Sequence, residues 1–138
     1  SLISLNLNCC SNLTTLPNSI GGLKSLTMLS LTHCKSLTKL PDSIGALTSL
    51  TSLSLCKGSN LTTLPKSLIS LNLNCCSNLT TLPNSIGGLK SLTMLSLTHC
   101  KSLTKLPDSI GALTSLTSLS LCKGSNLTTL PKSLISLN

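Results

Sequence analysis

The sequence contains no Phe, Tyr or Trp, no Arg, and only two acidic residues, Asp42 and Asp108. Aromatic side chains usually dominate buried cores, so their absence leaves an aliphatic core. A chain without Arg, without aromatic rings for stacking and without a run of lysines is a poor match for nucleic-acid binding. No apolar run is long enough to cross a membrane, and there is no initiating Met or signal peptide. We therefore interpret the sequence as an internal or processed segment.

The composition that remains is aliphatic and weakly charged. Hydrophobic residues make up 40% of the 138 residues, charged residues make up 9%, and most of the rest is Ser, Thr and Asn. This hydrophobic content predicts a folded chain rather than a disordered one. Ten lysines give a formal net charge of +8, a balance that favours nucleic acid, anionic lipid or acidic glycans as partners. The lysines are scattered, however, so we interpret them mainly as a solubility feature and predict no nucleic-acid or membrane partner.

The sequence is an internal repeat. Residues 1–66 recur without a single change as residues 67–132, and residues 133–138 begin a third copy. Within each copy the pattern LxxLxLxxCxxLxxLPxSIGxLxx occurs in two long units of equal length, and a shorter third unit lacks the segment Ile-Gly-x-Leu-x-x. The units begin near residues 2, 26, 50, 68, 92, 116 and 134. We therefore interpret residues 1–138 as one uncapped repetitive domain.

The first six positions of each unit predict a short strand. Leucines at positions 4 and 6, such as Leu5 and Leu7, fall on one face of a strand because successive side chains alternate. One unit buries little alone, but stacked units pair their strands in a parallel sheet and join their leucines into one core. A Leu-Pro pair cannot continue a helix, and an Ile-Gly pair lets the chain turn back. The return arm to the next strand should therefore contain turns or short 3₁₀ segments and little true α-helix.

This pattern resembles that of the leucine-rich repeat family, and the resemblance covers the whole chain. The L-x-x-L-x-L-x-x-C-x-x-L-x-x-L-P-x-S-I-G form is most similar to the repeats of plant-type immune receptors and of some bacterial leucine-rich repeat proteins. The resemblance implies a right-handed solenoid with a binding role. The sequence departs from the family in two ways. Its third unit is shorter than the usual range of about 20–29 residues, and it has neither diverged repeats nor capping segments.

The short unit predicts the shape of the solenoid. Such a solenoid curves because its return arms are wider than the spacing between its strands. Shortening every third arm therefore predicts a solenoid that is flatter than the usual horseshoe. The missing Ile and Leu also predict a groove on the convex side, beside four residues that lose a neighbour: Ile44, Leu47, Ile86 and Leu89.

The ends of the sequence predict self-association. Without caps, each end would present an unpaired strand and a row of leucines. Because residues 133–138 match residues 1–6, the two end surfaces are complementary, and head-to-tail stacking or covalent continuation would produce a fibre. A consensus design built by joining copies would have the same signature, although four cysteines per copy and no Trp or Tyr are unusual choices for a design.

Acceptor triplets for N-glycosylation, Asn-x-Ser/Thr, occur at position 11 of four units, just past the predicted strand. The candidate residues are Asn12, Asn60, Asn78 and Asn126. If the protein is secreted, glycans at these positions would follow one edge of the solenoid, and we favour this extracellular location. In a cytosolic protein the same triplets would be chance products of a surface rich in Ser, Thr and Asn. The abundant Ser and Thr residues are also candidates for O-linked sugars.

The cysteines divide into two groups. Cys10 and Cys34 occupy position 9, which should point inward and suits a small side chain that hydrogen-bonds weakly to the backbone. Cys9 and Cys56 occupy positions expected to face outward. Cys56 lies one unit before Cys75 and is displaced by one position, so a disulfide between these two is within reach. The alternative is four free thiols in each copy.

No metal site, cofactor site or catalytic site is predicted. His33 lies one unit after Cys9, as His99 does after Cys75, but the next unit has a lysine at this position and no third ligand is visible. The two aspartates fall in different copies, so they form no acid–base pair. The serines lie outside any nucleophile-elbow sequence, and there is no Gly-rich phosphate loop. We therefore predict that the protein is not an enzyme.

The outward strand positions carry small neutral side chains, without the aromatic or Arg anchors expected of a protein-recognition surface. The leading hypothesis is a structural, extracellular fibre segment that is glycosylated and continues head-to-tail, with itself and its glycans as partners. The alternative is a leucine-rich repeat binding module, natural or designed, for a protein, a polysaccharide or ice. Regular rows of Ser and Thr would suit an ordered lattice of the latter kinds.

Overall fold

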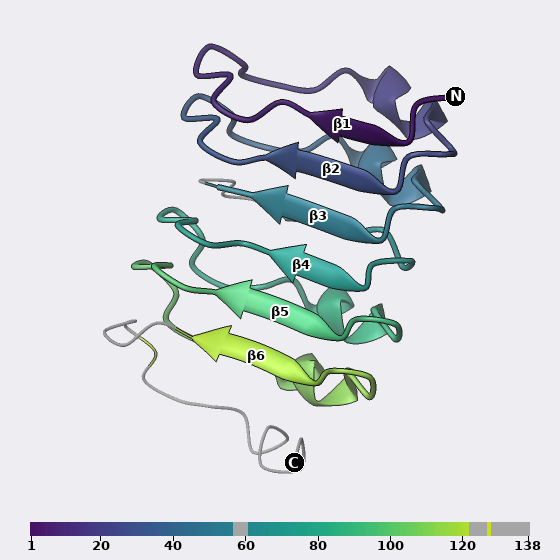
Figure 1. The fold of residues 1–138 in the computed structure, drawn as a ribbon. Coiled ribbons are helices and arrows are strands. Elements are labelled where there is room, and N and C mark those ends of the chain that lie inside the picture. The colour runs from purple at the N-terminus through teal and green to yellow at the C-terminus, as the bar shows by residue number, and fades with distance from the viewer. Residues whose placement is uncertain (57–60, 122–126, 128–138) are drawn as a thin grey trace.

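In the part of the chain that the structure describes, six short strands form one parallel sheet whose order follows the chain (Figure 1). The structure is a computed structural model and describes residues 1–56, 61–121 and 127. The strands are β1 (Ser4–Asn6), β2 (Met28–Leu31), β3 (Ser52–Leu55), β4 (Ser70–Asn72), β5 (Met94–Leu97) and β6 (Ser118–Leu121). Each strand begins one coil, which is one repeating unit of the sequence. The alternating leucines therefore form strands as predicted, and the chain is a leucine-rich repeat solenoid.

The strands stay paired in register across the short coil. Ser4 pairs with Met28 and Met28 with Ser52, so the first two coils advance the sequence by equal steps. Ser52 then pairs with Ser70, which is a shorter step, and the longer steps resume from Ser70 to Met94 and onward. Since the strand part of the pattern is intact in all three units, the residues missing from the third unit come entirely out of its return arm.

The return arms contain 3₁₀ turns and, in the described residues, no α-helix, as the sequence predicts. The turns are η1 (Asn18–Gly22), η2 (Asp42–Ala46), η3 (Asn84–Gly88) and η4 (Asp108–Ala112). Each follows a proline with φ between −66° and −69°, which directs the chain into the turn. The third coil has only a tight turn at residues 66–67 in this place. Consequently η1 contacts η2 and η3 contacts η4, whereas η2 and η3 do not touch.

The core is aliphatic and continuous along the solenoid axis. Leu29, Leu53 and Leu71 stack in register on neighbouring strands and are fully buried. In the described residues no polar or charged residue is buried as a whole. Because every coil contributes leucines at the same positions, each layer of the core covers the next.

The residues beside the short arm are covered, contrary to the expectation that they would lose a neighbour. Ile44 and Leu47 are at most 1% exposed, and so are Ile86 and Leu89. The short arm closes over the preceding coil, because the Ser67 hydroxyl donates to the Leu50 carbonyl at 2.6 Å and lies 3.3 Å from the Leu47 carbonyl. The missing segment therefore changes the surface of the return arms and does not expose the core.

The first glycine of η1, η2 and η3 lies against the next coil. A Cβ added at Gly87 would lie 2.6 Å from the Ser109 carbonyl oxygen, and one added at Gly21 would lie 2.7 Å from that of Ser43. Gly88, the next residue along, has nothing within 4 Å of such an atom. The Ile-Gly pair is thus required for the close stacking of neighbouring return arms.

We predict that Gly87→Ala destabilises the protein by about 1–3 kcal/mol, because the methyl group would have to displace a backbone carbonyl. The matched substitution Gly88→Ala should leave stability unchanged or raise it by about 0.4–1 kcal/mol. Urea unfolding followed by circular dichroism compares the two midpoints. Equal midpoints for the two variants would contradict the close contact between η3 and η4.

Candidate functional site

The outward residues of strands β1 to β6, together with the next outward residue after β1, β2, β4 and β5, form a neutral surface, called here the strand face. Its register places Ser4, Met28 and Ser52 side by side at the start of the strands, and the second copy repeats this row. Met28 and Met94, each 47% exposed, are its large apolar side chains within the described residues. The face consists of Ser4, Asn6, Asn8, Met28, Ser30, Thr32, Ser52, Ser54, Ser70, Asn72, Asn74, Met94, Ser96, Thr98, Ser118 and Ser120.

Asn8 and Asn74 connect neighbouring coils across the strand face. The Oδ1 atom of Asn8 accepts hydrogen bonds from the backbone N–H of Thr32 at 2.8 Å and from the hydroxyl of Ser30 at 2.7 Å. Asn74 makes the same two bonds in the second copy, at 3.0 and 2.6 Å. The sequence analysis did not identify this role. The signal is an Asn at position 7 of one unit followed by Ser-x-Thr at positions 5 to 7 of the next.

The turn that follows the strand carries the exposed Cys and His residues. Cys9 and His33 adopt left-handed backbone conformations, with φ of 63° and 59°, and Cys75 and His99 repeat them. The Cys9 N–H donates to the carbonyl of Thr32 in the next coil at 2.9 Å, which fixes the turn. Cys9 is exposed, as predicted. Within the part of the chain that the structure describes, no three His, Cys, Asp or Glu side chains gather as metal ligands would.

The position-9 cysteines Cys34, Cys76 and Cys100 are buried, as predicted for this position, and hydrogen-bond to the backbone of the preceding coil. Cys10, in the first coil, is half-buried and packs against the core. The thiol of Cys34 is fully buried and donates to the Leu7 carbonyl at 3.1 Å. Cys100 makes the same bond in the second copy, also at 3.1 Å. Burial raises the pKa of Cys34, so this thiol stays protonated at neutral pH. These cysteines act as small core residues rather than as nucleophiles.

Cys56 does not face outward, and in this the prediction was wrong. Its side chain is 8% exposed, and its Sγ atom lies 3.7 Å from the carbonyl oxygen of Cys75 in the next coil. The side chain is covered because it turns along the axis toward that neighbouring coil. Cys56 and Cys75 are both free thiols in the structure, and the disulfide between them stays a prediction.

Two of the four glycosylation candidates lie among the described residues. Asn12 and Asn78 are exposed in the turn that follows the strand, and Thr14 and Thr80, which complete their triplets, are exposed as well. Asn60 and Asn126 lie outside the described residues. Asn12 and Asn78 are therefore accessible to solvent, and their glycosylation stays a prediction.

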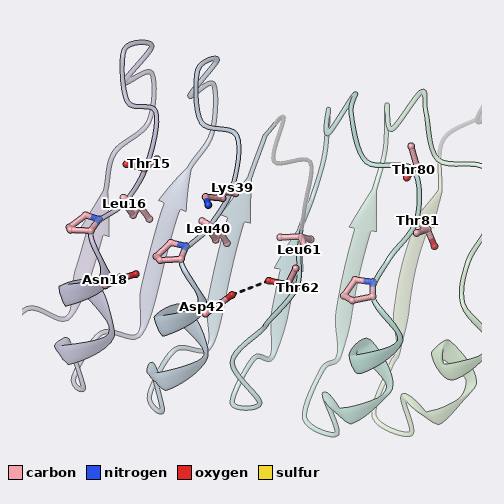
Figure 2. A pocket seen from close by; sticks show the side chains of 13 residues that line it. Thr15, Leu16, Asn18, Lys39, Leu40, Asp42, Leu61, Thr62, Thr80 and Thr81 are labelled. Atoms are coloured by element: carbon pink, nitrogen blue, oxygen red, sulfur yellow. Dashed lines mark hydrogen bonds between the residues drawn. The ribbon is translucent and has the colours of Figure 1, made fainter.

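A groove of about 870 Å³ runs across the return arms beside the short coil. Leu61 and Thr62 of the short coil line it, with Pro41 and Asp42 from the coil before and Pro83 from the coil after (Figure 2). The Thr62 hydroxyl donates to the Asp42 carboxylate at 3.3 Å. This is not the groove that the sequence predicts, because none of the four residues named for that groove lines it and all four are buried. The wall is made by Leu-Pro segments and extends back to Leu16 and Pro17 of the first coil.

The groove brings together little reactive chemistry. Its charged lining residues are Lys39 and Asp42, of opposite sign, and the rest of the lining is Thr, Asn, Pro and Leu. A second groove, of about 590 Å³, repeats the arrangement between the next two coils and is lined by Lys105 and Asp108. Among the described residues, no helix has the length and hydrophobicity needed to span a membrane.

The sequence pattern of the family described as Leucine Rich Repeat matches residues 1–23, 25–47, 67–89 and 91–113. These matches cover more than half of the chain, so the chain belongs to the leucine-rich repeat family. No curated protein matches the sequence.

Solved structures share the fold. The plant peptide hormone receptor RGFR1, in complex with RGF2, is 24% identical with a TM-score of 0.57, over 99% of this chain and 31% of that chain. The leucine-rich repeat domain of the type III effector XopL is 21% identical with a TM-score of 0.52, over 99% and 66%. The Arabidopsis receptor kinase HAESA, with the peptide hormone IDA and the co-receptor SERK1, is 21% identical with a TM-score of 0.54, over 99% and 32%. This chain therefore spans about a third of each receptor chain.

We predict that iodoacetamide at pH 8 modifies Cys9 at least tenfold faster than Cys34. Cys9 is exposed, whereas burial both shields Cys34 and raises its pKa, which lowers the fraction of reactive thiolate. Peptide mass spectrometry of the folded protein gives the two rates, and the same measurement in denaturant is the control, in which the rates should converge. Equal rates in the folded state would contradict the inward position of Cys34.

Proposed function

We propose that this chain is a segment of a structural, extracellular filament in which leucine-rich repeat coils continue head-to-tail. The observation that carries the proposal is the direction of the side-chain hydrogen bonds. Many of these bonds join one coil to the next, along the axis of the solenoid. Such bonds add to the parallel sheet and resist separation of the coils.

The axial bonds occur on several sides of the solenoid. On the strand face Ser30 donates to Asn8, and on the return arms the ammonium of Lys24 donates to the Ala46 carbonyl at 2.7 Å. Lys90 repeats the latter bond at 2.8 Å. The hydroxyl of Thr51 donates to the Thr27 carbonyl of the preceding coil at 3.2 Å. A solenoid tied together around its circumference would be stiff in bending and in extension.

The boundary between copies supports continuation. β3 of the first copy pairs with β4 of the second through Ser52 with Ser70 and Leu53 with Leu71. Leu68 and Leu71 at the start of the second copy are fully buried. Leu2, which is equivalent to Leu68, is 46% exposed in the first coil. A preceding copy would bury Leu2 as the first copy buries Leu68.

The strand face also supports a structural role over recognition. Binding hot spots are usually Trp, Tyr or Arg, and the sequence contains none of these. The polar side chains Ser30 and Asn8 are already engaged with each other, and Ser96 and Asn74 repeat this pairing. A face whose polar groups are already paired offers fewer free groups to a ligand.

The exposed candidates Asn12 and Asn78 support an extracellular, glycosylated form. They occupy the same place in the two copies, so their glycans would project from the same edge at a constant interval. Hydrated glycans together with lysines would keep a long polymer soluble.

A protein-binding module is the second candidate function. Its support is the fold shared with the receptors RGFR1 and HAESA, which were solved with peptide hormones, and the groove beside the short coil. Neither candidate involves catalysis, and we propose that the protein is not an enzyme.

Electron microscopy of the purified chain tests the filament. We expect filaments with an axial repeat of about 14 Å, because three strand spacings of about 4.8 Å make up one copy. Leu2→Lys places a charge on the end surface and should shorten the filaments, whereas Ser19→Lys, on an exposed return arm, should not. Discrete short arcs that do not lengthen with concentration would contradict the proposal.

Intact mass of the protein purified from its own source tests the glycans. We expect a mass above that of the amino acids. An amidase specific for N-glycans should lower this mass and convert the modified Asn12 and Asn78 to Asp. Asn12→Gln should remove one glycan without affecting the fold, because Asn12 is exposed. A mass fully accounted for by amino acids would rule out glycosylation at these sites.

A further inference from the structure

The strand face has a periodic relief along the solenoid axis. Met28 and Met94 stand on β2 and β5, each 47% exposed. The serines Ser52 and Ser70 lie between them in the same row of the sheet register. Each methionine therefore forms a ridge, and the two serines between the ridges form a shallow valley.

We propose that the strand face pairs with the strand face of a second copy of this chain. An offset of about one and a half strands, roughly 7 Å at a strand spacing of about 4.8 Å, places each methionine ridge over the partner's serine valley. The pattern is self-complementary, so one surface can serve both partners around a two-fold axis. This pairing is made by the outer surface of the sheet and not by the ends of the solenoid. It is therefore a separate interaction from the proposed filament and does not depend on the filament.

Charge favours this face over the other surfaces of the molecule. The chain carries a formal net charge of +8, so two copies repel each other at long range. The strand face itself consists of Ser, Thr, Asn and Met. The described charged residues lie in the turns and return arms: Lys24, Lys35, Lys39, Asp42, Lys66, Lys90, Lys101, Lys105 and Asp108. Pairing through the strand face keeps most like charges apart.

Hydrogen bonding within the face lowers the cost of removing water from it. The hydroxyls of Ser30 and Ser96 donate to Asn8 and Asn74 at 2.7 and 2.6 Å. The hydroxyl of Ser4 lies 3.7 Å from the sulfur of Met28. A polar group that already has a partner loses less when it leaves water than an unpaired one.

The shape of the sheet also permits the contact. A deeply concave face cannot meet a copy of itself. Curvature in a solenoid follows from return arms that are wider than the sheet, and here η2 and η3 do not touch because the coil between them has no 3₁₀ turn among its described residues. The short return arm of every third coil reduces the crowding between the arms, so the sheet curves less.

The area of the face sets the expected strength. Six strands at about 4.8 Å and a width of about four residues at about 3.3 Å give roughly 400 Å² per copy of the chain, or roughly 800 Å² for the pair. Stable interfaces bury about 1,200 Å² or more. The 138-residue chain should therefore pair weakly, and a chain with twice as many copies should pair much more tightly, because its contacts form together.

Sedimentation velocity in 0.3 M salt tests the pairing, with the chain itself and a tandem chain in which residues 1–132 occur twice. We expect dimers of both chains, with a Kd at least tenfold lower for the tandem chain. Met28→Lys with Met94→Lys should raise the Kd at least tenfold. Ser19→Lys with Ser85→Lys adds the same charge on exposed return arms and should leave the dimer intact. Circular dichroism checks that each variant is folded.

Leu2→Lys separates this pairing from association through the ends. Dimers that survive Leu2→Lys but not the methionine substitutions support pairing through the strand face. Association that is lost with Leu2→Lys and unaffected by the methionine substitutions would overturn it, while supporting the filament. A tandem chain that stays monomeric at millimolar concentration would overturn it as well, and so would a peptide bound tightly on the face of a monomeric chain. Filaments of single width would leave the proposed function standing without the pairing.

Discussion

Every coil of this molecule depends on its neighbours, because its leucines are covered only by the coil before and the coil after. Leu29, Leu53 and Leu71 are fully buried, although each belongs to a strand of at most four residues. No single unit, long or short, could bury such a set alone. The strand register, the close approach of glycine to the next return arm and the axial hydrogen bonds all serve this one requirement.

The sequence predicted the features that are the same in every unit and that arise within one unit. The Leu-x-Leu alternation predicted the strands, the Leu-Pro and Ile-Gly pairs predicted the 3₁₀ turns, and position 9 predicted the inward thiol of Cys34. These patterns depend on the alternation of side chains and on proline geometry, which act within one unit. Parallel pairing in register followed because identical units have identical places for their leucines.

Features that depend on the contact between unlike units were harder to predict. Cys56 is covered because the next coil follows after a shortened return arm and places the carbonyl of Cys75 beside it. Ile44 and Leu47 are covered because the hydroxyl of Ser67 draws the short arm across them. The bond between Asn8 and Thr32 also joins two different units. Each of these outcomes depends on how one coil packs against the next. The sequence pattern of a single unit does not describe that packing.

The junction between β3 and β4 has a further consequence for how the chain reaches its native state. Residues 4–6 and 70–72 have the same sequence, so β3 has two equally suitable partners, one in its own chain and one at the start of any other chain. The energy of the contact does not distinguish them. Only the short connection from β3 to β4 favours the partner in the same chain, by raising its effective concentration. The choice of partner strand is therefore set by which strands are connected in the chain and not by the contacts that they make. As a result, an intramolecular pairing and an exchange of coils between two molecules have nearly the same contact energy. By the same reasoning, removal or insertion of one whole copy would leave every contact between neighbouring coils unchanged. The fold itself therefore places no limit on the number of copies.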